Sequence, residues 1–187
     1  LVAARLGLRL ERFEITGPVD AFLATLPGAD ALRRGNVMAR SRMVVLHDLS
    51  RRDGSLVLGT GNRTEWLLGY TTLYGDAAYG LNPIGQLYKT EVRLLAHHLG
   101  LPREVLVKAP SADLWAGQTD EDEMGFTYAQ ADRLLHHLVD ERLEPRQLAS
   151  LGFAPGLVEQ VGARMRATAF KRVPPPVCSF GRPDGGP

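Results

Sequence analysis

The chain has 187 residues, of which 44% are hydrophobic, and its 22 basic side chains almost balance its 21 acidic ones. This length suits one globular domain, and a net charge of +1 gives no electrostatic footprint for nucleic acid. A single cysteine excludes an intrachain disulfide framework, and no apolar run is long enough to span a bilayer. These features predict a cytoplasmic protein without nucleic-acid or membrane partners.

Hydrophobic periodicity and breaker residues predict a chain of helices interrupted by two strands. Long loops rich in glycine and polar residues are predicted over 71–87 and 110–119, and the proline-rich tail from Val173 is predicted to be extended or disordered. In chain order, we expect a helix over 1–6, a strand over 8–15, helices over 18–26 and 36–49, a strand over 56–58, and helices over 64–70, 88–99, 127–140, 144–151 and 155–169.

This order of elements favours an α/β layer fold with a doubly wound parallel sheet and a helical C-terminal extension. The three-residue run at 56–58 has the size of a buried parallel strand. Two strands are too few for such a sheet. We therefore expect further strands upstream of Leu1.

The segment after the second predicted strand is the most informative one. Gly59-Thr60-Gly61 leads directly into a helix, which places backbone N–H groups where open α/β sheets bind anions. A dinucleotide-binding fingerprint requires glycine at position 64, where this chain has threonine. The alternative interpretation is a tight turn between strand and helix.

Glu65 and Lys89 each lie in the first turn of a predicted helix. A carboxylate there often stabilises the helix dipole, but it also suits Mg²⁺ bound to phosphates. A lysine there opposes the dipole, and a bound phosphate would explain it. A solvated lysine is the plainer interpretation.

Taken together, several segments resemble NAD synthetase, the ATP-dependent ligase that amidates deamido-NAD. They occur in the family's order and span roughly residues 30–175. The matching segments are Gly35-Asn36-Val37-Met38-Ala39-Arg40-Ser41-Arg42-Met43, Leu58-Gly59-Thr60-Gly61-Asn62-Arg63-Thr64-Glu65, Leu68-Gly69-Tyr70 to Tyr74-Gly75-Asp76, Asn82-Pro83 to Tyr88-Lys89-Thr90, Lys108 to Trp115, Gln118-Thr119-Asp120-Glu121, and Phe170-Lys171-Arg172.

The resemblance implies the fold of the adenine-nucleotide (PP-loop) pyrophosphatases and a two-step reaction. The nicotinate carboxylate attacks the α-phosphate of ATP and releases pyrophosphate, and ammonia then displaces AMP. The implied roles are ATP binding by Thr60, Lys89 and Ser111, Mg²⁺ binding by Glu65, deamido-NAD binding by Arg40, Tyr70, Phe170 and Lys171, and positioning of ammonium by Asp76, with Asp76 and Lys89 as the catalytic pair.

Departures from the family pattern are also visible. Leu73 replaces a lysine, and Gly80 an aspartate, of many ammonia-dependent members. The sequence around Asp76 more closely resembles the glutamine-dependent branch, in which an upstream amidase domain supplies ammonia. The family's phosphate loop is absent from these 187 residues. We therefore interpret residues 1–172 as an N-terminally incomplete synthetase domain, followed by the tail 173–187, and expect little activity from the fragment alone.

Two other functions stay open at this point. The chain could be a non-catalytic nucleotide-binding or dimerisation module derived from such a ligase, or a dinucleotide-binding oxidoreductase, which Thr64 disfavours. By analogy with the family, we expect a homodimer or a higher homo-oligomer.

Overall fold

The computed structural model describes residues 2–112, 114–115 and 117–178. Leu1, at the start of the first predicted helix, Asp113 in the second predicted loop and 179–187 of the predicted tail lie outside this range. The elements are α1 (Val2–Arg5), α2 (Thr16–Ala24), α3 (Ala31–Asp53), α4 (Arg63–Leu68), α5 (Lys89–His98), α6 (Arg103–Val107), α7 (Asp120–Met124), α8 (Tyr128–Leu135), the π-helical turn His136–Asp140, α9 (Pro145–Ser150), α10 (Pro155–Ala167) and the 3₁₀ turn Ala169–Arg172.

Most predicted helices are present, and local caps set their ends. Asp30 accepts the backbone N–H of Arg33 at 2.8 Å, so α3 begins five residues earlier than its apolar pattern indicates. The predicted capping box of Thr127 and Gln130 opens α8. The short helices α6 and α7 were not predicted, because five residues are too few to show a helical period.

The predicted doubly wound parallel sheet is wrong. Within the described ranges the structure contains no sheet, and its nearest approach to one is an isolated parallel bridge between Leu58 and Leu81. Gly59 donates to the Leu81 carbonyl at 2.7 Å, and Gly80 donates to the Val57 carbonyl at 2.9 Å. The strand predicted over 8–15 is also wrong, since these residues have no regular secondary structure and are mostly exposed.

The physical reason is that a strand is stable only beside partners. The apolar run at 56–58 is not buried, since Leu56 is 69% and Leu58 57% exposed. A short apolar run therefore indicated extended backbone but could not show whether a neighbouring strand covers it. The described residues bring only one short segment, around Leu81, alongside it.

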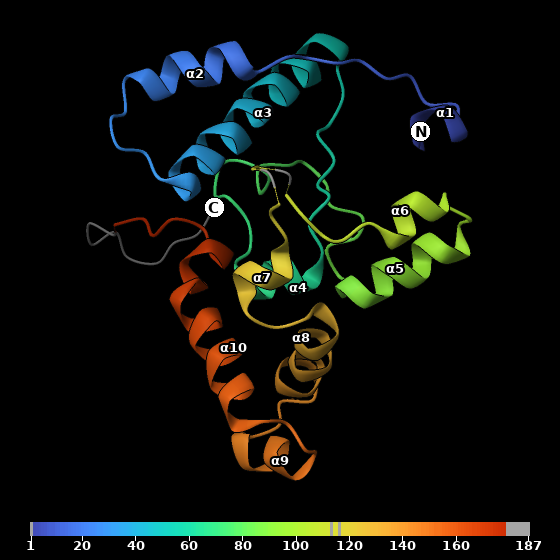
Figure 1. The fold of residues 1–187 in the computed structure, drawn as a ribbon, viewed down its shortest axis with the longest axis vertical. Coiled ribbons are helices and arrows are strands. Elements are labelled where there is room, and N and C mark those ends of the chain that lie inside the picture. The colour runs from blue at the N-terminus through green and yellow to red at the C-terminus, as the bar shows by residue number, and fades with distance from the viewer. Residues whose placement is uncertain (1, 113, 116, 179–187) are drawn as a thin grey trace, which may run out of the picture.

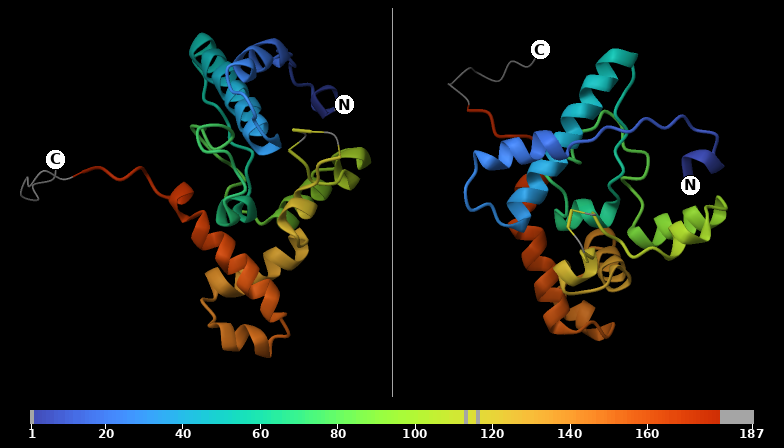
Figure 2. Two further views of the ribbon diagram at one scale, coloured as in Figure 1. Left: turned by 60° about the vertical axis from the view of Figure 1, so that its left-hand side comes forward. Right: turned by 45° about the horizontal axis from the view of Figure 1, so that its top comes forward.

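The helices are arranged in an upper pair and a lower group (Figure 1). Helices α2 and α3 pack against each other above the central loops. Helices α8 and α9 lie below α4 and α7, and α10 runs from α9 upward to the level of α7. Helices α5 and α6 pair at one side. Both turned views in Figure 2 again show α2 and α3 above α9. The candidate functional residues lie mostly where these groups meet.

The main hydrophobic core belongs to the lower group. It includes side chains from α4, α7, α8, α9 and α10 and from the loops that join them, several of them without any exposed surface. Its buried members are Leu68, Tyr88, Met124, Phe126, Tyr128, Ala131, Leu134, Leu135, Leu148, Phe153 and Val161. The core therefore supports α4 and the start of α5 from below.

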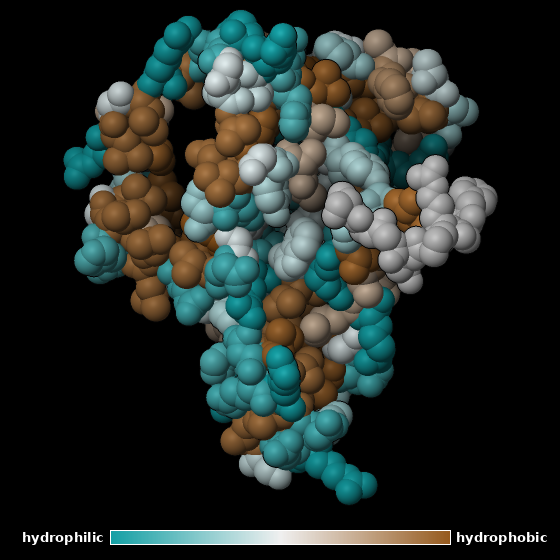
Figure 3. All heavy atoms as spheres, turned by 180° about the vertical axis from the view of Figure 1, so that it is seen from behind, coloured by the Kyte–Doolittle hydropathy of each residue, from teal (hydrophilic) through white to brown (hydrophobic). Residues whose placement is uncertain are grey.

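Other apolar side chains remain at the surface. Leu94 and Leu99 near α5 are 71% and 63% exposed, and Val107 of α6 is 69% exposed. The space-filling view from behind shows apolar side chains gathered on the side of the molecule that carries these helices (Figure 3). Among the described residues, none of the helices has both the length and the apolar character needed to cross a membrane.

Candidate active site

The site is built on the adjoining N-termini of α4 and α5. Asn62 caps α4: its side chain accepts the Glu65 backbone N–H at 3.0 Å, and Glu65 Oε2 accepts the Asn62 backbone N–H at 3.0 Å. Arg63 donates its backbone N–H to the Leu87 carbonyl at 2.8 Å, two residues before Lys89. These bonds fix the start of α4 against the segment that leads into α5.

Glu65 and Lys89, which are 24 positions apart, form an ion pair. Lys89 Nζ donates to Glu65 Oε1 at 2.9 Å, and the two side chains are only 21% and 14% exposed. The ammonium also lies 4.9 Å from the centre of the Tyr128 ring. The carboxylate and the ring together offset the unfavourable dipole that a lysine meets at a helix N-terminus.

Tyr128 connects this pair to the buried carboxylate of Asp120, which Tyr70 also contacts. The Tyr128 hydroxyl donates to Asp120 Oδ2 at 2.8 Å and lies 3.4 Å from Glu65 Oε1. The Tyr70 hydroxyl donates to Asp120 Oδ1 at 3.1 Å. Burial, reinforced by the nearby carboxylates, raises the pKa of both phenols, so they stay neutral hydrogen-bond donors.

A second group surrounds the loop that follows α4. Lys171 Nζ donates to the carbonyls of Gly69 at 2.8 Å and Thr71 at 2.6 Å, and the Arg40 guanidinium donates to the Leu73 carbonyl at 3.2 and 3.3 Å. Burial lowers the pKa of Lys171, and Asp76 opposes that shift. The structure thus brings Arg40, Lys171, Tyr70 and Asp76 to one loop.

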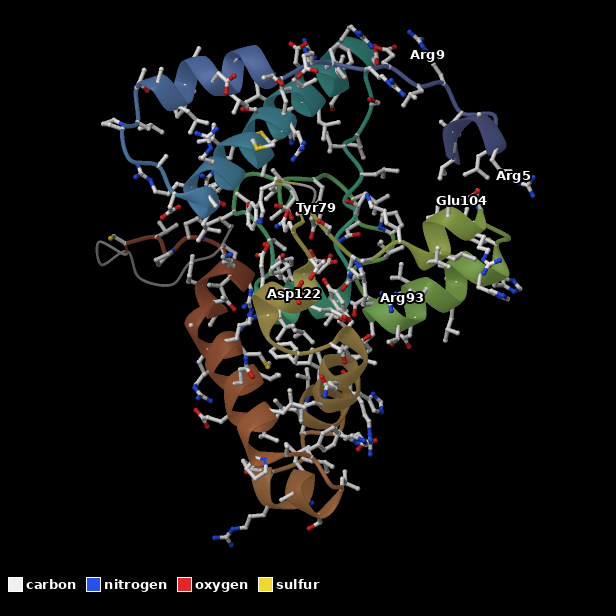
Figure 4. All side chains as sticks on the ribbon, in the orientation of Figure 1. Arg5, Arg9, Tyr79, Arg93, Glu104 and Asp122 are labelled. Atoms are coloured by element: carbon white, nitrogen blue, oxygen red, sulfur yellow. The ribbon has the colours of Figure 1, made fainter. Side chains whose placement is uncertain are left out.

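Asp76 lies in a turn of this loop, where its Oδ1 accepts the Thr72 backbone N–H at 2.7 Å. The side chain is exposed to solvent, yet the surrounding protein removes enough water to raise its pKa above the ordinary value. The carboxyl group also lines a pocket of about 290 Å³ that Asn62, Trp66, Tyr79 and Asn82 help to form. Figure 4 shows Tyr79 among the central loops, between the α2–α3 pair and α7.

Gly59 of the glycine-rich segment has a steric role in this region. A Cβ at Gly59 would lie 2.6 Å from the Tyr79 ring, whereas a Cβ at Gly61 would meet only Glu65 Oε2, at 3.8 Å. The first glycine is therefore needed for packing of the loop 71–87. At the second glycine a side chain would find room.

The other predicted site residues lie around these two groups. Thr60 is exposed in the loop before Asn62, and Ser111 is half-buried in the loop after α6. Phe170 is 61% exposed in the 3₁₀ turn that also holds Lys171. Their roles as ligand-binding residues stay predictions.

The fit of these residues to Mg²⁺ depends on Glu65. Mg²⁺ binds one or two protein carboxylates and keeps the rest of its shell as water and phosphate oxygen. Glu65 supplies one such carboxylate at the start of α4, and its Oε1 already pairs with the Lys89 ammonium. Among the described residues no group of three or more acidic, histidine or cysteine side chains forms a complete protein cage for a metal.

Comparison with known proteins identifies the family. Residues 1–175 match the family described as NAD synthase. This chain belongs to that family. The resemblance drawn from the ordered motifs is thereby confirmed, and the family is one of ligases.

A relative from Chlorobaculum parvum, named NH(3)-dependent NAD(+) synthetase, is 51% identical over 180 residues, which are 96% of this chain and 65% of the relative. The chain therefore spans about two-thirds of that protein's length.

Two solved structures are also similar to this chain. That of NMN synthetase from Francisella tularensis has a TM-score of 0.82 at 33% identity and covers 95% of this chain and 70% of its own. That of glutamine-dependent NAD+ synthetase from Acinetobacter baumannii, in complex with ADP, has a TM-score of 0.55 at 30% identity, covering 96% of this chain and 35% of its own. Nucleotide binding thus occurs within the family.

Sequence reasoning missed the buried side chains that hold the site together. The sequence motifs include Asp120 without predicting a role for it, and they predict Tyr128 and Asp132 only as parts of a helix. A signal for the last two exists, because they are spaced i, i+4 on the apolar face that also carries Ala131 and Leu135. A carboxylate on such a face is buried only with partners.

Proposed function

We propose that the protein to which this chain belongs amidates deamido-NAD to NAD, using ATP and ammonia and releasing AMP and pyrophosphate. Membership of the NAD synthase family and the name of the Chlorobaculum parvum relative support this proposal. The observation that carries it is the contact between Glu65 and Lys89, because two motifs with implied roles toward Mg²⁺ and ATP phosphates meet at 2.9 Å.

In the first step, a carboxylate oxygen of the nicotinate ring forms a bond to the α-phosphorus of ATP, and the bond to pyrophosphate breaks. The Lys89 ammonium would stabilise the negative charge that accumulates on the phosphate oxygens. Glu65 would hold Mg²⁺, which supplies charge neutralisation to the phosphates when bound. Thr60 and Ser111 would complete the contacts to ATP.

In the second step, ammonia forms a bond to the acyl carbon of the adenylate and AMP leaves. Asp76 is suited to collect ammonium, because a carboxylate provides both charge and hydrogen-bond acceptors. Its place on the lining of the pocket supports this role. A proton must leave ammonium before attack, and the raised pKa of the Asp76 carboxyl makes it a better acceptor for that proton.

The group around the loop 69–76 would bind the dinucleotide. Arg40 and Lys171 bring two cations to one loop, which suits an anionic pyrophosphate, and Tyr70 offers a ring for the pyridine. Phe170 is exposed beside them. Lys171 already donates to two carbonyls, so part of its role is to hold the loop in place for the substrate.

The test uses the full product of the gene that encodes these residues, with AMP and NAD measured together. Lys89→Ala and Glu65→Gln should each lower kcat/KM by about 100-fold to 1,000-fold, the effect of removing a charge that stabilises the transition state. Glu65→Gln should also raise the Mg²⁺ concentration needed for half-maximal rate. Arg93→Ala removes an exposed cation from the same helix α5 and should leave the rate unchanged.

The same assay, run with alternative substrates, measures the specificity of the enzyme for its acid substrate and its nitrogen donor. Deamido-NAD is compared with nicotinate mononucleotide, because one similar structure is that of an NMN synthetase. Ammonium is compared with glutamine, because another is glutamine-dependent. Wild-type AMP release in the Lys89→Ala protein would contradict the proposed role of the pair.

A further inference from the structure

We propose that Asp132 is a positioning residue that sets the geometry of the Glu65–Lys89 pair from the opposite side of the site. The inference rests on the function proposed above. Asp132 lies on α8, is 5% exposed, and carries a carboxylate with both oxygens engaged by donors from other helices. Neither of these two hydrogen bonds goes to Glu65 or Lys89 itself.

The carboxylate binds the two neighbours of the pair. One oxygen accepts the hydroxyl of Thr64, which precedes Glu65, and the other accepts the backbone N–H of Thr90 at 2.7 Å, which follows Lys89. The Thr64 hydroxyl in turn accepts the Lys89 backbone N–H at 3.0 Å. Asp132, Thr64 and the start of α5 thus form a closed set of hydrogen bonds.

These bonds fix the relative position of two helix starts. Thr64 lies in the first turn of α4 and Thr90 in the first turn of α5, so one side chain of α8 holds both turns. The dipole of α5 favours the Asp132 carboxylate at the N-terminus of that helix, whereas it disfavours the Lys89 ammonium at the same end. Movement of either turn would separate Glu65 from Lys89.

Helix α8 approaches the pair with two residues one turn apart. Tyr128 places its ring under the Lys89 ammonium and its hydroxyl near Glu65. Asp132 accepts the Thr64 hydroxyl on one side and the Thr90 backbone N–H on the other. Both are buried, and Tyr128 belongs to the main core. The core of the lower helices is thereby coupled to the position of the reacting groups.

Only a carboxylate meets this set of donors. A buried charge is tolerated when hydrogen bonds compensate for lost water, and here a hydroxyl and an amide do so. In Asp132→Asn, the amide oxygen can accept from one of the two donors, the Thr64 hydroxyl or the Thr90 N–H. The new NH₂ group would face the other donor and could not accept its hydrogen bond. One of the two helix starts is then released.

The experiment measures kcat and KM in the full product of the gene, below the melting temperature of every variant. Asp132→Asn should lower kcat by about 100-fold, the cost of misplacing catalytic groups by roughly 1 Å, and should change KM for deamido-NAD less than threefold. Thr64→Val removes the same hydroxyl bond and should lower kcat as well. The double variant should lose less than the product of the two effects, because one hydrogen-bond set is shared.

Two matched variants separate positioning from stability. Thr64→Ser keeps the hydroxyl and should retain kcat within about threefold. Leu135→Ala empties a buried position on the same helix, lowers the melting temperature, and should keep kcat near wild type. Wild-type kcat in Asp132→Asn, or an equal loss of kcat in Leu135→Ala, would overturn the inference.

A readout independent of activity distinguishes the two proposals. Hydrogen exchange at the Thr90 amide should be faster in Asp132→Asn than in wild type and unchanged in Leu135→Ala after correction for global stability. If wild type releases no AMP, the proposed function fails while this exchange still decides whether Asp132 holds α5. An unchanged Thr90 amide would reject the positioning role whatever the activity.

Discussion

The ion pair of Glu65 and Lys89 compensates two partly buried charges for lost hydration. Each charge would lose hydration at its position, and the direct bond at 2.9 Å compensates both. The Tyr128 ring adds a cation–π contact, which is worth about 1–2 kcal/mol in a partly desolvated place. A phosphate arriving at Lys89 would therefore replace a carboxylate partner rather than meet a free cation.

The ionised Asp76 carboxylate is expected to lower the free energy of unfolding while it serves the proposed ammonium site. Its raised pKa means that the folded chain binds this proton more tightly than the unfolded chain does, so the free energy of unfolding falls as pH rises above 3.8 through the folded-state pKa. Asp76→Asn keeps an acceptor for the Thr72 N–H and removes that penalty. The variant should thus be at least as stable as wild type at pH 7, and the difference should shrink toward pH 4.

The same substitution should raise KM for ammonium by about 10-fold to 100-fold, the value of one charge-assisted hydrogen bond. Urea unfolding at several pH values and steady-state rates at varied ammonium check the two parts. A stability difference that does not change with pH would show that desolvation of the carboxyl is unimportant. An unchanged KM would remove Asp76 from the ammonium site.

At the scale of elements, α4 depends on what surrounds it. Six residues are too few for an independently stable helix. Its N-terminus has the Asn62–Glu65 capping box, and its C-terminus is covered by cations: Arg164 donates to the Leu68 carbonyl at 3.3 Å and Arg172 to the Leu67 carbonyl at 2.7 Å. Side chains from α10 and from the 3₁₀ turn after it thus bind the last carbonyls of α4.

Gly69 is the point where these two elements touch. Its φ is +61°, and a Cβ there would lie 2.2 Å from Thr168. Gly69→Ala should lower the free energy of unfolding by about 2–4 kcal/mol, from left-handed strain plus overpacking. Gly100→Ala is the control, because Gly100 has φ +66° with nothing within 4 Å, and should cost only about 1 kcal/mol.

Chemical unfolding of both variants measures this difference. Equal destabilisation would mean that α10 does not restrict the end of α4. The comparison also bears on the site, since Lys171 binds the Gly69 carbonyl and the following loop carries Tyr70 and Asp76.

At the scale of the whole molecule, stability is concentrated below the site. Buried apolar side chains gather in α8, α9 and α10 together with α4, whereas α2 and α3 bury only Val19, Leu23, Gly35 and Ala39. The site lies between a well-packed base and a lightly packed upper pair (Figure 1). Its lower half is therefore the more rigid one.

Native-state hydrogen exchange should reveal this division. Amides of α8 are expected to exchange only with global unfolding, while those of α2 should exchange at least about 100-fold faster, since few buried contacts hold that helix. Mass spectrometry of proteolytic fragments resolves the two regions. Equal protection of α2 and α8 would show that the upper pair is as stable as the core.

The sequence alone determined the family and most of the helices. Ordered motifs identify NAD synthase, and local signals such as the Thr127 and Gln130 box open α8 where expected, because caps and helical periods are short-range. The sheet could not be decided in this way, since the exposed segment 56–58 has the composition of a buried strand and burial depends on distant neighbours. Only the tertiary structure brings Glu65 to Lys89 and places Asp132 between their helices, because those contacts join residues 24 to 68 positions apart whose meeting depends on the packing of α4, α5 and α8.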